Sequence, residues 1–153
     1  MDRPESRPLF TLRIDLHPTI DIGATPAGQR RIFPVSGGTF VGDRISGEVL
    51  PVAGADYLIG RTDGSAQQDV RLLLRASDGD LIIMAYRGVR RASPEVLTRL
   101  AAGEDVPPDE YYLRTAPFFE TGSLRHAWMN GIVSIAIGTR RPGYVEYSVF
   151  EIL

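Results

Sequence analysis

The segment QQDVRLLLRASDGDLIIMAYR, residues 67–87, consists of a stretch with the two-residue period of a β-strand, a turn signal and a second β-like run. Its first half, Gln67 to Arg75, places Val70, Leu72 and Leu74 on one face and Asp69, Arg71 and Leu73 on the other. The turn signal Ser77-Asp78-Gly79-Asp80 follows, and a second β-like run, Leu81 to Arg87, begins at once. The segment therefore predicts an antiparallel hairpin.

Similar runs on both sides of this hairpin extend the β pattern over most of the chain. Phe10, Leu12, Ile14 and Leu16 share one strand face. Further strands are predicted near residues 30–35, 111–115, 127–137 and 144–152, and glycines punctuate residues 36–50. Glycines within strand patterns mark bulges or tight corners, so Gly37, Gly38, Gly42 and Gly47 are interpreted as barrel corners and not as a nucleotide-binding loop. Many short strands with regular turns favour a closed barrel, although a sandwich also fits.

One helix interrupts the strands, over residues 94–102. Ser93 is a suitable N-cap, Pro94 suits the first helical position and Glu95 favours the positive end of the helix dipole. Gly103 would terminate the helix. A single short helix among strands is interpreted as a lid or plug on a barrel.

The amino-acid composition limits the kinds of catalysis and metal binding that the chain can support. The chain has 153 residues, no Cys and a formal net charge of −2, and all of its basic residues are Arg. Thiol catalysis, disulfides, thiolate metal sites, Schiff-base lysines and P-loop lysines are therefore excluded. With two histidines, no basic stripe and no apolar run long enough for a membrane span, we expect no metal site, no cofactor, no nucleic-acid partner and no membrane association. A cytoplasmic location is expected.

The length suits one domain. Residues 1–7 are predicted to be a flexible tail and residues 8–153 a single mostly β domain, an antiparallel β-barrel of about eight or nine strands with one short helix.

Four stretches resemble one family. They are SGGTFVGDRISGEVLPVAGADYLIGRTDG (36–64), QDVRLLLRASDGDLIIMAYRG (68–88), EYYLRTAPFFETG (110–122) and AWMNGIVSIAIGTR (127–140). Together they are similar to the uncharacterised bacterial and fungal proteins grouped as domain of unknown function 3237, over about residues 10–152. The resemblance implies a small antiparallel barrel of the allene-oxide-cyclase and dirigent type, and it implies no agreed activity, cofactor or catalytic residue.

Strand parity suggests a candidate pocket. Asp69 and Arg71 share one strand face, and Trp128 and Asn130 share one face of the predicted strand over residues 127–137. We predict a site in which Asp56, Asp69 and Glu120 supply acid or base groups, and the following residues bind a ligand: Arg71, Tyr86, Arg114, Trp128 and Asn130. The competing interpretation is that these charges form structural ion pairs or are simply solvated.

Three functions remain open at this point. The first is a cofactor-free acid–base enzyme, such as an isomerase, cyclase, lyase or hydrolase, acting on a small hydrophobic or aromatic molecule in the barrel. The second is a non-catalytic barrel that binds such a molecule, as lipocalin-like barrels do. The third is an oligomerising structural domain.

The predicted strand 127–137 carries apolar side chains on both faces. Met129, Val133, Ile135 and Ile137 would share one of them, and Val145, Tyr147 and Val149 of the last strand would extend that face. An apolar outer face on a barrel is usually covered by a partner, so a homodimer or larger homo-oligomer is predicted.

Overall fold

The computed structural model describes residues 2–153, and Met1, the first residue of the predicted tail, lies outside the described residues. Strands dominate these residues. They are β1 (Ser6–Leu16), β2 (Ile20–Thr25), β3 (Gly28–Val41), β4 (Ser46–Val49), β5 (Ala55–Gly60), β6 (Ala66–Ala76), β7 (Leu81–Ala92), β8 (Tyr111–Glu120), β9 (Val133–Arg141) and β10 (Tyr144–Ile152). One α-helix, α1 (Pro94–Ala101), and two 3-10 helices, η1 (Pro108–Glu110) and η2 (Ala127–Gly131), connect them.

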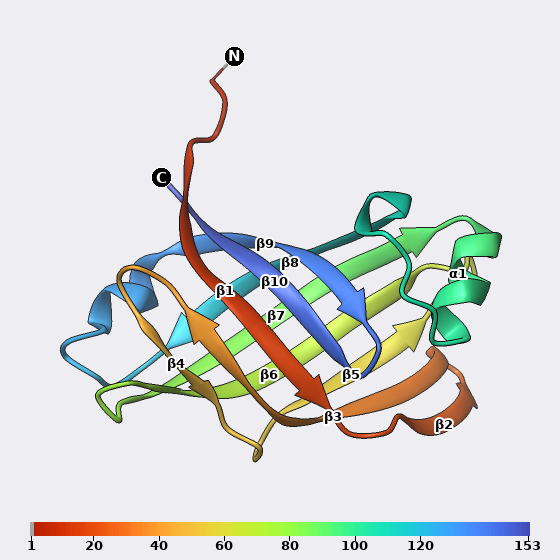
Figure 1. Ribbon diagram of the computed structural model, residues 1–153, viewed down its shortest axis with the longest axis horizontal. Helices are drawn as coiled ribbons and strands as arrows, with labels where there is room; N and C mark the ends of the chain where they lie inside the picture. Colours follow the sequence, from red (N-terminus) through yellow and green to blue (C-terminus); the bar gives the residue numbers. More distant parts are fainter. Residues whose placement is uncertain (1) are drawn as a thin grey trace.

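The strands close into an antiparallel barrel with eight positions (Figure 1). The neighbours run β1-β10-β9-β8-β7-β6, and β1 also pairs with β3. Between β3 and β6, one position is shared, because β4 pairs with both strands towards one end and β5 pairs with both towards the other. β2 extends β3 outside this ring. The predicted barrel is therefore confirmed.

The predicted hairpin is also confirmed, as β6 and β7. Leu72 pairs with Met84 and Val70 pairs with Tyr86, and these four side chains are buried. The opposite face of β6, which carries Asp69, Arg71 and Arg75, is exposed. Alternation along each strand thus separates the barrel interior from the solvent.

A glycine makes the corner in β3 where the chain bends onto β1. Gly38 has a φ of +147°, and a Cβ at this position would lie 2.0 Å from the carbonyl oxygen of Arg13. The close approach of the two backbones therefore requires glycine, as the corner interpretation of this stretch predicted.

The hydrophobic core fills one end of the barrel more tightly than the other. Phe40, Leu74, Met84, Phe119 and Met129 are buried where β4 and η2 lie. At the opposite end, α1 lies beside the barrel opening (Figure 1). The helix begins after Ser93, whose hydroxyl accepts a hydrogen bond from the Val96 amide, and only Leu100 of the helix is buried. The helix prediction was right to within one residue.

The predicted strand over residues 127–137 is wrong in its first half. Residues 127–131 form η2, with Met129 buried beneath it, and β9 begins at Val133. The compact turn caps the filled end of the barrel. Consequently Met129 does not share a strand face with Val133.

The apolar outer face was also predicted with the wrong members. Val133, Ile135 and Ile137 do point outward and are 54%, 45% and 41% exposed. Val145, Tyr147 and Val149 instead point into the barrel, because Tyr147 pairs with Gly138 and Val149 with the buried Ala136. The exposed Phe118 of β8 is another apolar side chain on the outside of the barrel.

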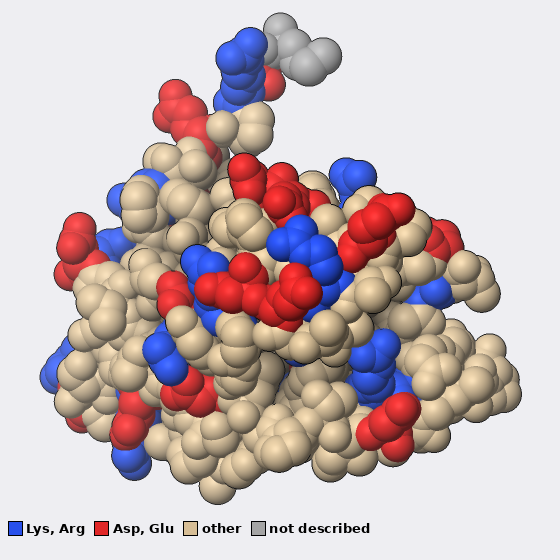
Figure 2. Space-filling model, turned by 45° about the vertical axis from the view of Figure 1, so that its right-hand side comes forward, with Lys and Arg blue, Asp and Glu red and all other residues tan. Residues whose placement is uncertain are grey.

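The first and last strands of the chain, β1 and β10, lie side by side (Figure 1). β1 begins at Ser6, inside the predicted tail, and pairs there with Ile152, while the Leu153 amide donates to the Glu5 carbonyl. On the face drawn in Figure 2, acidic and basic side chains are interspersed without a continuous basic stripe. None of the helices within residues 2–153 has the length and hydropathy that crossing a bilayer requires.

Candidate functional site

A cavity lies inside the barrel at the end beside α1. Its volume is about 50 Å³, and apolar side chains form most of its wall: Ile14, Leu16, Phe33, Val35, Leu58, Val70, Leu113 and Val145. A water needs about 10–15 Å³, so the cavity has room for on the order of four waters or a small aliphatic group, and a benzene-sized ring, which a cavity of about 150 Å³ accepts, has to extend towards the outside. The polar lining residues are few: Asp56, Gln68, Tyr86, Arg90, Arg140 and Tyr147.

The cavity continues outward into a wider space, which we call the mouth. The mouth has a volume of about 670 Å³ and lies between α1 and residues of β2, β3, β7 and β9. Phe33, Arg90 and Arg140 line both spaces and therefore mark the junction between them. A ligand reaching the cavity this way passes the two arginines.

Asp56 is the carboxyl group of the cavity. It sits on β5 opposite Phe33 of β3 and Val70 of β6. Its Oδ1 accepts a hydrogen bond of 3.0 Å from the Asp69 amide. Burial raises the pKa of Asp56 to about 7, and this amide and the charges of Arg90 and Arg140 offset part of the rise. A carboxyl group with this pKa can both give and accept a proton near neutrality.

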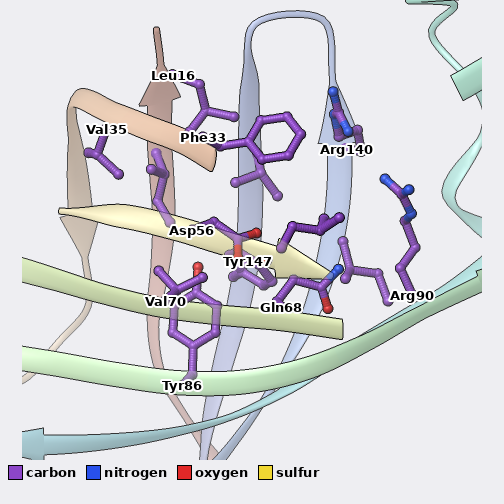
Figure 3. Close-up of a pocket in the computed structure, with 14 residues that line it drawn as sticks. Leu16, Phe33, Val35, Asp56, Gln68, Val70, Tyr86, Arg90, Arg140 and Tyr147 are labelled. Atoms are coloured by element: carbon purple, nitrogen blue, oxygen red, sulfur yellow. The ribbon is translucent and has the colours of Figure 1, made fainter. Parts of the chain in front are cut away.

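Two guanidinium groups stand at the inner end of the mouth. Burial lowers the pKa of Arg90 to about 10, and the positive charges of Arg140 and Arg31 act in the same direction. Arg140 has a lowered pKa for the same two reasons, burial and the charge of Arg31. Arg90 Nε is buried and has no hydrogen-bond partner. Figure 3 shows both arginines on one side of the cavity, from β7 and β9.

The inner wall carries further polar groups. The rings of Tyr86 and Tyr147 pack edge to face, 5.5 Å apart, and burial raises the pKa of both hydroxyls. The Oε1 atom of Gln68 is buried without a partner. Figure 3 shows Asp56 and Tyr147 near the middle of the cavity, with Gln68 towards the side of Arg90. Buried polar atoms of this kind are normally satisfied, so the lining is suited to a polar ligand group or water.

The structure does not bring the sequence-predicted site residues together. Asp56 and Tyr86 line the cavity, but Asp69 and Arg71 are exposed on the outer face of β6, where they line a separate surface groove with Phe118. The reason is that side chains alternate between the two faces of a strand. Asp69 and Arg71 alternate with the inward-facing Val70, Leu72 and Leu74, so they point outward.

Arg114 and Glu120 also lie outside the barrel. Arg114 stacks on the ring of Tyr112, with its guanidinium carbon 4.9 Å from the ring centroid. Glu120 is exposed at the end of β8, opposite Ile83. Neither residue lines the cavity.

Trp128 and Asn130 belong to η2 at the filled end of the barrel. Arg44 stacks on Trp128, 4.5 Å from the ring centroid. The Asn130 amide accepts from the Thr121 backbone N–H at 2.8 Å and donates to the Thr121 carbonyl at 3.0 Å. Their shared strand face was a wrong prediction, because the segment is a 3-10 turn.

Two acidic residues and a histidine lie close together at the turn of the β6–β7 hairpin. Candidate ligand atoms of Asp78, Asp80 and His126 lie within 4.8 Å of one another. His126 Nε2 lies 2.6 Å from Asp78 Oδ2, and the Ser123 hydroxyl donates to Asp80 at 2.5 Å. Each of the three side chains thus has a protein partner, and the cluster ties the hairpin turn to the segment before η2.

Sequence reasoning missed four polar cavity residues: Gln68, Arg90, Arg140 and Tyr147. For three of them a signal was present. Gln68 shares parity with Val70, Arg90 shares parity with Tyr86 four residues earlier, and Tyr147 lies between the buried Val145 and Val149. Only the closed fold brings Arg140 of β9 to the same opening as Arg90.

The geometry defines a class of protein: a closed antiparallel β-barrel with one filled end and, at the other, a cavity that holds a carboxyl group, two tyrosines and two arginines. The chain belongs to the family described as protein of unknown function DUF3237, whose model matches residues 4–152.

Its relatives share the barrel. A protein of Rhodopseudomonas palustris named UPF0311 protein is 32% identical over 149 residues, covers 97% of each chain, and has a solved structure with a TM-score of 0.96. A beta-barrel like protein of Acinetobacter baumannii is 36% identical, with a TM-score of 0.86 over 100% of this chain and 98% of that one. A structure described as an enzyme from Penicillium herquei is 19% identical, with a TM-score of 0.73 over 100% and 97% of the two chains.

Proposed function

We propose that this protein is a cofactor-free enzyme that transfers protons on a small hydrophobic or aromatic molecule bound in the barrel cavity, with Asp56 as the acid–base group. The observation that carries the proposal is the convergence of a carboxyl group with a pKa of about 7, two arginines and two tyrosines on one largely apolar cavity. Perturbed titratable groups in a concave apolar site are typical of active sites.

The side chains that line the cavity support one kind of chemical step, proton transfer at a carbon next to a carbonyl group. The Asp56 carboxylate takes a proton from a carbon next to a substrate carbonyl, and the electron pair of the broken C–H bond moves to the carbonyl oxygen as an enolate. Arg90 or a tyrosine hydroxyl then stabilises that oxygen. Return of the proton from Asp56 to another carbon or to the oxygen of the enolate completes an isomerisation. Alternatively, the enolate carbon attacks a second carbonyl carbon of the same molecule, the electron pair of that C=O bond moves to its oxygen, and this oxygen takes the proton from Asp56, which completes a cyclisation. A pKa near neutrality suits both directions of the transfer.

A non-catalytic binding protein is the second candidate. The mostly apolar wall of the cavity favours it, because such walls hold ligands through burial alone. The carboxyl group argues for catalysis over simple binding, since a carrier of hydrophobic molecules gains nothing from a desolvated carboxylate. The likeness to a protein described as an enzyme is compatible with catalysis on this fold.

Hydrogen–deuterium exchange tests the proposal. Phenylacetone, 3-benzoylpropanoate and related neutral and carboxylate-bearing aryl ketones with exchangeable protons next to the carbonyl are incubated with the protein in deuterated buffer, and loss of the proton signal is followed by NMR. We expect the wild-type protein to accelerate exchange, with a rate that rises as pH passes through about 7, the pKa of Asp56. Asp56→Asn should lower the accelerated rate by about 10²–10⁴-fold, the usual contribution of a general base.

Glu120→Gln is the matched control. Glu120 is exposed at the end of β8 and does not line the cavity. We expect its exchange rate to equal that of the wild type. Equal rates in the wild type and Asp56→Asn, or no acceleration of any ketone in the set, would contradict the acid–base role. Saturable binding of the same ketones without exchange would favour the binding protein.

A further inference from the structure

The arginines at the junction of cavity and mouth point to the substrate class. We infer that the molecule bound in the barrel carries an anionic group, a carboxylate or an oxyanion of similar size, which Arg90 and Arg140 hold while its apolar part enters the cavity. The inference rests on the proposed function, since it concerns the ligand of the same site.

The first argument is the absence of internal partners. Seven arginines of the chain form ion pairs with carboxylates: Arg7, Arg13, Arg44, Arg75, Arg99, Arg125 and Arg141. Within residues 2–153, Arg31, Arg90 and Arg140 form none, although they are partly buried and stand near one another. Partly buried guanidinium groups without anions repel one another and lose hydration, so an anionic ligand would relieve both costs.

The second argument is an unused donor. Arg90 Nε is buried and has no hydrogen-bond partner in the part of the chain described, and Arg90 lines both the cavity and the mouth. Arg140 is held beside it by two contacts. Its backbone amide donates to the buried Tyr111 hydroxyl at 2.8 Å, and its guanidinium lies over the Phe33 ring, 5.4 Å from the centroid. The arginine fork is thus positioned by the fold before any ligand arrives.

The carboxylates nearby do not neutralise this cluster. Asp21 of β2 is the acidic residue that lines the mouth, and its Oδ1 accepts the Gly23 amide at 2.9 Å. Asp56 lies deeper, and its raised pKa leaves it substantially protonated near neutrality. Three guanidinium groups therefore face the mouth against one exposed carboxylate.

Size fixes the orientation of the ligand. The inner cavity, about 50 Å³, has a mostly apolar wall and room for one edge of a ring, whereas the mouth is more than ten times larger and contains the arginines. An aryl carboxylate would place its ring against Val70, Leu113 and Val145 and its anion at the junction. The carbons between ring and carboxylate would then pass Asp56, where the proposed proton transfer occurs.

A pair of neutral and charged ligands tests this inference on the wild-type protein. The probes are 3-phenylpropanoate and 3-phenylpropanamide, which differ only in the charge of the head group. Affinities are measured by calorimetry, and the binding site is located by amide chemical shifts. We expect the carboxylate to bind about 10- to 100-fold more tightly than the amide, as charge-assisted hydrogen bonds predict. The difference should shrink as salt increases.

Three variants complete the test. Arg90→Met and Arg140→Met should each remove most of the preference for the carboxylate, whereas Arg87→Met should keep it, because Arg87 lies on the same strand but is exposed outside the barrel. Equal binding of both probes in the cavity would overturn the anion preference and leave the proposed pocket standing. Failure of both probes to shift any cavity amide would count against the pocket itself, and the inference would fall with it. The wild-type comparison holds even if a variant folds poorly.

Discussion

Replacing Asp56 by Asn should make the protein more stable at neutral and alkaline pH. Burial raises the pKa of Asp56 from 3.8 to about 7, so the folded state binds the proton more tightly than the unfolded state. The stability linked to this proton is fully present below pH 4 and is lost as the pH rises through 7. Asn keeps an acceptor for the Asp69 amide and carries no charge to desolvate.

The magnitude follows from the pKa difference. About three units at about 1.4 kcal/mol each give a ceiling of about 4 kcal/mol, and partial solvent access through the mouth reduces this to about 2–3 kcal/mol. For a chain of this size, each kcal/mol moves the melting temperature by about 2–4 °C, so Asp56→Asn should melt roughly 4–12 °C higher at pH 8.

Urea denaturation between pH 4 and pH 9 measures this difference. The two proteins should be equally stable near pH 4, diverge between pH 4 and pH 7, and differ by a constant amount above pH 8. Glu120→Gln, at an exposed position of β8, controls for the loss of any carboxylate. A difference that does not change with pH would refute the argument, as would a carboxyl carbon resonance of Asp56 that titrates near pH 4.

Three further predictions concern the scaffold. Glu151 accepts hydrogen bonds from Arg7 and Arg44, and these bonds lower its pKa. Glu151→Gln should therefore lower the free energy of unfolding by about 1–2 kcal/mol at pH 7. Urea titrations should show that this difference vanishes as acid protonates the carboxylate of the wild-type protein. A Cβ on Gly138 would lie 2.6 Å from a side-chain carbon of Leu113 and 2.7 Å from one of Tyr147. Gly138→Ala should therefore lower the free energy of unfolding, measured by calorimetry, by about 1–3 kcal/mol. Gly131→Ala is the control, because a Cβ there meets open space, and it should change the stability by less than about 0.5 kcal/mol. The exposed face of β9 should support self-association, so light scattering should find a homodimer or larger assembly that Ile135→Glu dissociates; a wild-type monomer at high micromolar concentration would contradict this.

Local patterns were enough to predict the strands and the helix. The hairpin of β6 and β7 follows from alternation and an Asp-Gly turn, and α1 follows from Ser93 and Pro94, because these signals act within a few residues. Residues 127–131 were harder. The run AWMNGIVSIAIG is mostly apolar, and such a run does not distinguish a strand from a compact turn that caps a barrel.

The candidate site was predictable only in part. Asp56 and Tyr86 were found, but Asp69 and Arg71 were chosen for their charge although their parity opposes that of Val70 and Leu72. A consistent use of parity places them in solvent and selects Gln68 instead. Which end of the barrel stays open depends on where Phe40, Phe119 and Met129 meet in three dimensions, and no local pattern contains that information.

The hydrogen bond between Asp56 and the Asp69 amide has a consequence for the barrel wall. β5 and β6 pair at residues 55–71, 56–70, 59–67 and 60–66, and the ladder skips the two rungs between, 57–69 and 58–68, where the Asp56 side chain accepts a hydrogen bond from the Asp69 amide. A change in the charge of Asp56 therefore changes how strongly β5 and β6 are held together at this contact, which we call the seam. The Asp69 amide, which lies in the barrel wall, becomes a reporter whose hydrogen-exchange rate and chemical shift follow proton movements inside the cavity. A ligand that draws Asp56 inward would loosen this seam, so that occupancy of the interior could be read from outside without a label.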